Sequence, residues 1–181
     1  MKMYQEKEGG INLKTRGFEV CKGYENKGIN LPIRSTKNSV AYDLEAAEDT
    51  IIPSIWKVVF ENAKKFISGN TNYENIVPTK VYTGIKSYFK EDEVMIIANR
   101  SSGPSKLGLV MANSIGIFEC DYYNNPSNDG NIIFQFYNFF PNDLKILKGD
   151  RIGQAYFQNF LIADNDNATG IRQGGIGSTG K

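Results

Sequence analysis

The chain contains no histidine among its 181 residues. This absence excludes Ser-His-Asp and Cys-His catalysis and removes nearly every zinc hydrolase site. Cysteine is scarce as well: Cys21 and Cys120 are too few for a structural zinc site, and we expect both to be free thiols. Any chemistry must therefore use carboxylates, hydroxyls, Tyr, Lys, Arg, backbone amides and a hard metal such as Mg²⁺.

Long apolar runs and an excess of one charge are also missing. The net charge of +1 argues against non-specific binding to duplex nucleic acid, which requires a marked basic excess. No apolar run reaches the length of a membrane span, and residues 1–8 lack the apolar segment of a secretory signal. We therefore expect a cytoplasmic protein of one domain that binds neither a membrane nor nucleic acid.

Short β segments are the main pattern along the chain. They are rich in Val, Ile, Tyr and Phe and are separated by Gly, Pro, Asn and Asp clusters. Many short strands at regular spacing favour a sandwich or barrel over a parallel sheet with crossover helices. The expected strands are residues 17–21, 42–46, 51–52, 80–87, 93–99, 107–112, 117–119, 131–139, 145–146 and 152–160.

Residues 54–69 break this pattern, because their apolar residues recur with the period of a helix. Ser54 suits the N-cap and Gly69 suits the stop. We interpret the segment as a helix that covers the sheet and buries its aromatic side. A helix that binds a partner protein is the alternative.

Residues 100–106 combine Arg, Ser, Gly and Lys directly after an apolar strand. Their donors can converge on phosphate, and Gly103 lets the backbone approach closely. Further along, residues 113–122 read as a hairpin with two carboxylates, Glu119 and Asp121, one residue apart. Such residues point to opposite faces of a strand, so only one is expected to face a pocket, where it can act as general base. A polar hairpin rim is the alternative.

Three other segments carry polar groups of this kind. Residues 149–154 form a turn that feeds a strand, and Asp43 stands alone among apolar residues, either buried and hydrogen-bonded or directed toward the water shell of a metal. Residues 172–181 are rich in glycine and contain one arginine. Such a tail is either a frayed terminus or a lid that orders on an anionic ligand.

Taken in order, these segments resemble the five motifs of the trimeric dUTPase family, and the resemblance covers essentially the whole chain. The matching residues are 40–44, 100–103, 113–122, 149–154 and 172–180, and the helix at 54–69 resembles an insertion. The resemblance implies an all-β, jelly-roll-like barrel over residues 1–163. It also implies a flexible glycine-rich arm, residues 164–181, that closes over the site of a neighbouring subunit in a homotrimer.

The resemblance further implies hydrolysis of dUTP to dUMP and pyrophosphate with Mg²⁺, which limits uracil incorporation into DNA and supplies dUMP for dTMP synthesis. Glu119 would activate water, and Tyr122 would pack under the deoxyribose. Mg²⁺ would be held by the substrate phosphates, with Asp43 acting through water. The remaining implied contacts are Asn113, Gly116 and Ile117 to uracil; Arg100, Ser101, Ser102, Gly103 and Gln154 to the phosphates; and Arg172, Ile176, Gly177, Ser178 and Thr179 from the arm.

Three residues depart from the family pattern; Ala41 in place of a glycine is a minor backbone change, and the other two keep alternatives open. Glu119 replaces an aspartate, and Ile176 replaces the phenylalanine that would stack on uracil. We therefore expect reduced turnover. The alternative is a nucleotide-binding or regulatory protein with the same fold that contacts a partner protein through the inserted helix or the arm. The related dCTP deaminases are not favoured, because Gln135 stands where that chemistry needs an acid.

Overall fold

Residues 14–172 and 174 are described in the computed structural model, and β-strands dominate them. Two short helices, α1 (Ile55–Ile67) and α2 (Gly103–Leu107), and a 3-10 turn, η1 (Cys120–Tyr122), complete the regular structure of this part. The all-β expectation is therefore confirmed. The strands are β1 (Gly17–Val20), β2 (Tyr42–Glu45), β3 (Thr50–Ile52), β4 (Thr79–Tyr82), β5 (Ile85–Tyr88), β6 (Glu93–Asn99), β7 (Leu109–Met111), β8 (Ile115–Phe118), β9 (Ile133–Asn138), β10 (Leu144–Ile146) and β11 (Arg151–Asn159).

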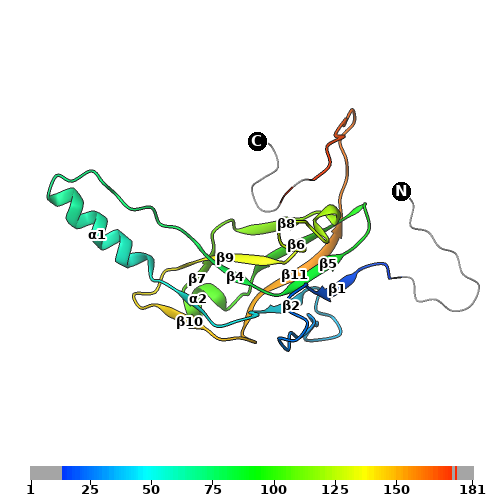
Figure 1. Ribbon diagram of the computed structural model, residues 1–181, viewed down its shortest axis with the longest axis horizontal. Coiled ribbons are helices and arrows are strands. Elements are labelled where there is room, and N and C mark those ends of the chain that lie inside the picture. Colours follow the sequence, from blue (N-terminus) through cyan, green and yellow to red (C-terminus); the bar gives the residue numbers. More distant parts are fainter. Residues whose placement is uncertain (1–13, 173, 175–181) are drawn as a thin grey trace, which may run out of the picture.

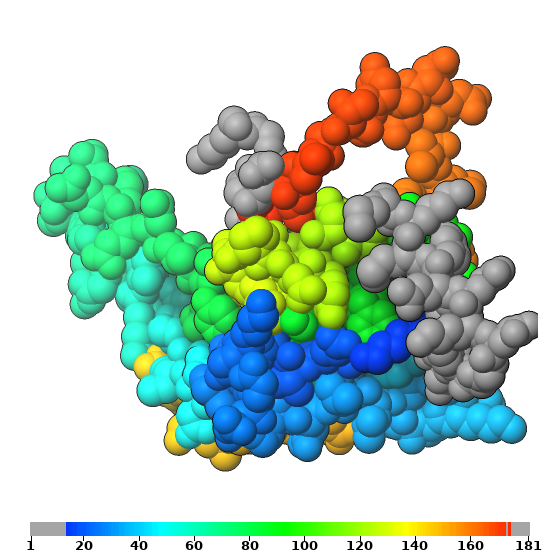
Figure 2. All heavy atoms as spheres, turned by 45° about the vertical axis from the view of Figure 1, so that its right-hand side comes forward, coloured from blue at the N-terminus to red at the C-terminus, as the bar shows by residue number. Residues whose placement is uncertain are grey.

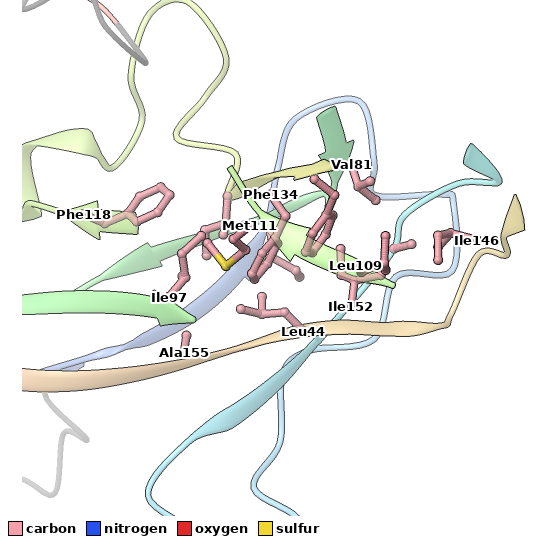
Figure 3. Packing of buried hydrophobic residues seen from close by; sticks show 14 of the residues in the cluster. Leu44, Val81, Ile97, Leu109, Met111, Phe118, Phe134, Ile146, Ile152 and Ala155 are labelled. Atoms are coloured by element: carbon pink, nitrogen blue, oxygen red, sulfur yellow. The ribbon is translucent and has the colours of Figure 1, made fainter. Parts of the chain in front are cut away.

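The core lies between a four-stranded sheet, β2-β11-β6-β8, and a three-stranded sheet, β4-β9-β7. Side chains of both sheets meet in one apolar cluster, among them Leu44 and Ile97 from the first sheet and Phe134 from the second (Figure 3). Burial of each such side chain stabilises the fold by about 1.5–3 kcal/mol. The pairs β1-β5 and β3-β10 flank these sheets, and the whole is a jelly-roll-like β fold.

Two expected strands differ from the observed ones. The segment 80–87 is divided, because Gly84 takes a left-handed backbone (φ +66°) and separates β4 from β5. The segment 107–112 begins later than expected, because residues 103–107 form α2. Pro104 suits the first turn of that helix, and Gly108 ends it in the left-handed conformation.

Helix α1 forms where the sequence predicts it, with Ser54 as N-cap: the hydroxyl oxygen of Ser54 accepts a hydrogen bond from the backbone N–H of Trp56. The expectation that its aromatic side is buried is wrong. No residue of α1 is buried, Phe60 is 61% exposed, and the helix extends away from the sheets (Figure 1). A helical period shows that one side of a helix is apolar, but it does not place a sheet beneath that side.

The two cysteines are free thiols, as expected. Burial raises the pKa of the Cys21 thiol to about 12, so this side chain behaves as an inert core residue. Among the helices of the described segment, none combines the length and apolar character needed to cross a bilayer.

Candidate functional site

Asp43 on β2 lies between two arginines that come from distant parts of the chain. Its Oδ1 lies 3.3 Å from Nε of Arg100, and its Oδ2 lies 3.1 Å from Nη1 of Arg151. Asp43 is mostly buried, whereas both arginines keep more of their surface in solvent. The carboxylate therefore fixes two guanidinium groups that remain accessible to an anion.

Strand β11 explains why these three residues meet. It pairs with β2 on one side and with β6 on the other, so Gln154 lies opposite both Asp43 and Ala98. Arg100 follows the end of β6, and Arg151 begins β11. The first, second and fourth of the five segments thus converge at one end of the four-stranded sheet.

A cavity of about 360 Å³ opens beside this cluster. Its polar wall comes from the segment after β6 and from the residues around the start of β11, including Arg100, Ser102, Asp150 and Arg151, with Gly103 beside them. Ser101 is exposed outside this wall. Gln154 donates from Nε2 to the backbone oxygen of Asn99 at 3.2 Å, which ties β11 to the end of β6, directly before Arg100. The cavity combines cationic groups with close backbone, as a triphosphate site requires.

The third segment forms a second cluster. Strand β8 lies at the edge of the four-stranded sheet, where Gly116 is buried while Asn113, in the preceding turn, and Ile117 are exposed. Tyr122 in η1 is only 6% exposed, and its ring meets that of Phe118 edge-on with centroids 5.2 Å apart. Burial raises the pKa of the Tyr122 hydroxyl, which stays neutral near neutral pH.

The expectation that Glu119 and Asp121 point to opposite faces of a strand is wrong. Strand β8 ends at Phe118 and the chain turns into η1, so the alternation of an extended strand no longer applies. Both carboxylates instead contact Arg172: its Nη2 lies 2.7 Å from Oε2 of Glu119, and its Nε lies 2.7 Å from Oδ1 of Asp121. The guanidinium carbon also lies 5.7 Å from the centre of the Tyr122 ring.

The arm thus reaches the hairpin of its own chain in this structure. In Figure 2 the red end of the described chain rests on the yellow-green hairpin segment. Asn125 reinforces this contact, because its Nδ2 donates to the backbone oxygen of Gly174 at 2.9 Å. Sequence reasoning missed Asn125; its only signal is its place in a run of Asn, Pro, Ser and Asp directly after the hairpin. The expected contacts Ile176, Gly177, Ser178 and Thr179 lie outside the described residues.

The two clusters lie at opposite ends of β6. Phe118 is paired with Met95 near the start of that strand, whereas Arg100 follows its end. At about 3.3 Å per residue, Glu119 and Arg100 are roughly 20 Å apart along the strand. Within one chain, the hairpin carboxylates and the arginine cluster therefore do not face the same phosphate group.

The described residues contain no cluster of three or more His, Cys, Asp or Glu that could hold a metal ion. Asp150 lies in the cavity lining, and its Oδ2 accepts the backbone N–H of Leu147 at 2.8 Å. Asp43 lies behind the lining, paired with Arg100 and Arg151, and its two oxygens offer about four acceptor sites. It can keep both arginine partners and still accept a hydrogen bond from a metal-bound water.

Comparison with known proteins gives a consistent picture, although no family model matches the chain. The deoxyuridine 5'-triphosphate nucleotidohydrolase of Lactococcus lactis subsp. lactis (strain IL1403) is 42% identical over 170 residues, which cover 93% of this chain and 99% of that relative. The crystal structure of dUTPase from Streptococcus mutans is 34% identical, with a TM-score of 0.67 over 82% of this chain and 98% of that one. The dUTPase of Staphylococcus bacteriophage 80alpha, at 14% identity, shares the fold with a TM-score of 0.59 over 88% of this chain and 99% of that one.

Proposed function

The chain belongs to the deoxyuridine triphosphate nucleotidohydrolase (dUTPase) family, and from this premise we propose that it hydrolyses dUTP to dUMP and pyrophosphate in sites shared between subunits. This activity limits uracil incorporation into DNA and supplies dUMP for dTMP synthesis. The observation that carries the shared site is the separation of the two side-chain clusters along β6.

A water that attacks the α-phosphorus needs a base beside it and cations on the same phosphates. Glu119 and Arg100 cannot serve one α-phosphate within a single chain, because roughly 20 Å of strand lies between them. In a homotrimer, the hairpin of one subunit can face the arginine cluster of the next. We therefore assign the base to one subunit and the phosphate donors to its neighbour.

In the proposed reaction, one water molecule attacks dUTP. Glu119 accepts a proton from the water, the new P–O bond forms at the α-phosphorus, and the bond to the β-phosphate breaks so that pyrophosphate leaves. Arg100, Ser102 and Gln154 would hold the phosphates, with Ser101 and Gly103 beside them. Donors held in place by the sheet need no rearrangement as charge develops, which is the main source of acceleration in such sites.

Recognition of the nucleoside is assigned to the hairpin. Backbone groups at Gly116 and Ile117, with Asn113, would read the uracil edge. Tyr122 would pack under the deoxyribose and exclude a 2′-hydroxyl. Its burial suits this role, because a fixed ring leaves no room for an extra oxygen. The arm, residues 164–181, would then close over the nucleotide.

Mg²⁺ is expected to enter the site bound to the triphosphate of the substrate. Bound there, it would offset phosphate charge and fix the orientation of the phosphate chain. Asp43 would accept a hydrogen bond from one of its waters, a role that fits a carboxylate already held by two arginines. No protein ligand is assigned to the metal.

The test is pyrophosphate release from dUTP, measured with and without Mg²⁺. We expect Glu119→Gln to lower kcat by a factor on the order of 10² to 10⁴, because it cannot accept the proton. The matched control is Glu61→Gln on α1, where the carboxylate pairs with Lys64 on the same helix. Release no faster than the uncatalysed reaction, or equal rates for wild type and Glu119→Gln, would contradict the proposal.

A further inference from the structure

Lys86 on β5 is a buried cation that plays no part in the proposed reaction. It is 6% exposed, which is rare for a lysine. Its Nζ donates to Oδ1 of Asn124 at 2.6 Å and to Oδ2 of Asp129 at 2.8 Å. It also lies 5.1 Å from the centre of the Tyr123 ring. Every one of these contacts belongs to the loop that follows Tyr122.

That loop takes an unusual backbone at the two positions that Lys86 touches. Asn124 has φ +57° and Asp129 has φ +58°, the left-handed region that residues other than glycine rarely adopt. Asn and Asp tolerate this region better than other residues with a side chain, and contacts to their side chains stabilise it further. The buried ammonium supplies one contact at each of the two positions, so it fixes both ends of the loop.

Between these ends lies the residue that holds the hydroxyl of Tyr122. Asn128 donates from Nδ2 to the Tyr122 oxygen at 2.6 Å, and it is the direct neighbour of Asp129. The rest of the Tyr122 ring packs against Phe118. The position of the phenol therefore depends in part on the loop. Lys86 holds the loop together with the backbone N–H of Lys22, which donates to Oδ2 of Asp129 at 2.8 Å.

The acidic residues around Lys86 also favour a fixed position of its ammonium group. Glu19 lies opposite Lys86 in the β1-β5 pair, and its carboxylate accepts a hydrogen bond from the Tyr123 hydroxyl at 2.5 Å. Asp129, whose side chain is 13% exposed, has a second lysine near it, but Lys22 Nζ is 3.9 Å away and 81% exposed. Removal of Lys86 leaves Asp129 partly buried without its close cation, a costly state that opening of the loop relieves.

We propose that Lys86 is a positioning residue for sugar discrimination: by holding Asn124 and Asp129, it keeps Tyr122 where a 2′-hydroxyl cannot fit. This inference rests on the proposed function, since it takes the deoxyribose to lie on Tyr122. Lys86 touches neither the nucleotide nor Glu119. Its loss should therefore change the choice between deoxyribose and ribose more than it changes the binding of phosphates.

The experiment measures the dissociation constants of the α,β-imido analogues of dUTP and UTP by calorimetry, with full-length protein and Mg²⁺. The quantity of interest is the ratio of the ribo to the deoxy constant. We expect Lys86→Met to lower this ratio roughly tenfold, because a shift of about 1 Å in a positioning group has effects of that order or larger. Lys22→Ala removes the exposed lysine beside the same carboxylate and should leave the ratio within about twofold of wild type.

A second pair of variants keeps the backbone intact. Asn124→Gly removes the amide that Lys86 contacts but accepts a positive φ without strain, and we expect the ratio to fall about threefold. Asn124→Asp keeps the acceptor oxygen and should retain the wild-type ratio. This pair of variants tests the positioning role of Lys86 if Lys86→Met does not fold.

The inference is overturned if Lys86→Met or Asn124→Gly lowers the melting temperature while the ratio stays within about twofold of wild type, because the network is then only structural. It is also overturned if wild-type protein binds the two analogues alike. Failure of the proposed function is a different result: deoxy-selective binding without pyrophosphate release from dUTP. In that case the ratio of the ribo to the deoxy dissociation constant still tests the positioning role of Lys86.

Discussion

The Nη2 atom of Arg172 lies 2.7 Å from Oε2 of Glu119, so the arm cation is paired with the carboxylate that we propose as the base. A triphosphate brings competing oxygens with more negative charge. Closure of the arm on substrate would then exchange a carboxylate partner for a phosphate partner. The same exchange would free Glu119 to accept a proton.

Arg172→Met is expected to raise KM for dUTP by roughly 10–100-fold, the equivalent of one charged hydrogen-bonded contact. Steady-state kinetics with dUTP measure it. Lys64→Met removes an exposed cation on α1, where it pairs with Glu61 of the same helix, and should leave KM unchanged. An unchanged KM in Arg172→Met would show that the arm does not hold the nucleotide through this residue.

Glu119→Asp is expected to raise kcat. The family pattern has aspartate at this position, and the extra methylene of Glu119 moves the attacking water, a displacement of about 1 Å that can cost on the order of 100-fold. Single-turnover rates with dUTP measure the chemical step directly, and the rate of Glu119→Gln gives the value without the proposed base. A fall in rate on going to aspartate would mean that the pocket has adjusted to glutamate.

A mixture of two inactive variants is expected to recover activity if each site is shared. Glu119→Gln lacks the base and Arg100→Met lacks a phosphate donor, but a site that takes each residue from a different chain can be intact. Random assembly after unfolding and refolding at equal amounts would leave about one quarter of the sites complete. Pyrophosphate release measures the recovery. No activity above that of the separate variants would place both residues in one chain's site.

Stability should depend on Glu93 at acidic pH. Hydrogen bonds from Arg16 to Glu93, a mostly buried carboxylate, lower its pKa below the ordinary 4.5. A lowered folded-state pKa contributes stability above the unfolded value, and this contribution is lost as the pH falls through the folded value. The stability difference between wild type and Glu93→Gln, about 1–2 kcal/mol near neutral pH, should therefore shrink below about pH 4.5. Urea unfolding at a series of pH values measures it; a difference independent of pH would contradict the assignment.

Gly153→Ala should destabilise the fold by about 1–3 kcal/mol. A Cβ at position 153 would lie 2.0 Å from Cε1 of Phe134, which is fully buried and cannot move aside. Gly170→Ala is the matched control, because nothing lies within 4 Å of its Cβ position. Thermal unfolding compares the two. Equal melting temperatures would mean that the core accommodates the methyl group.

The sequence predicts the strands well where side chains alternate against a core. In β6 the buried and half-buried residues alternate over Glu93–Ala98, and the predicted bounds 93–99 match the strand. The sequence did not predict α2, because its five residues are too few to show a periodic pattern. The burial of α1 could not be predicted, because it depends on which other element packs against the helix.

The candidate site was predictable by residue type but not by arrangement. The register of β11 with β2 and β6 brings Asp43, Arg100 and Arg151 together, and no single segment contains that information. The pairing of Glu119 and Asp121 with Arg172 was missed because β8 ends one residue earlier than the expected strand. The burial of Lys86 could not be predicted either. In the sequence it is one polar residue in a strand, and its burial follows from the fold.

The position of Trp56, the sole tryptophan, bears on spectroscopy of this protein. Its indole nitrogen donates to the backbone oxygen of Phe139 at 2.8 Å, in the first turn of the projecting helix α1. Intrinsic indole emission will therefore follow the docking of that helix on the β9-β10 connection.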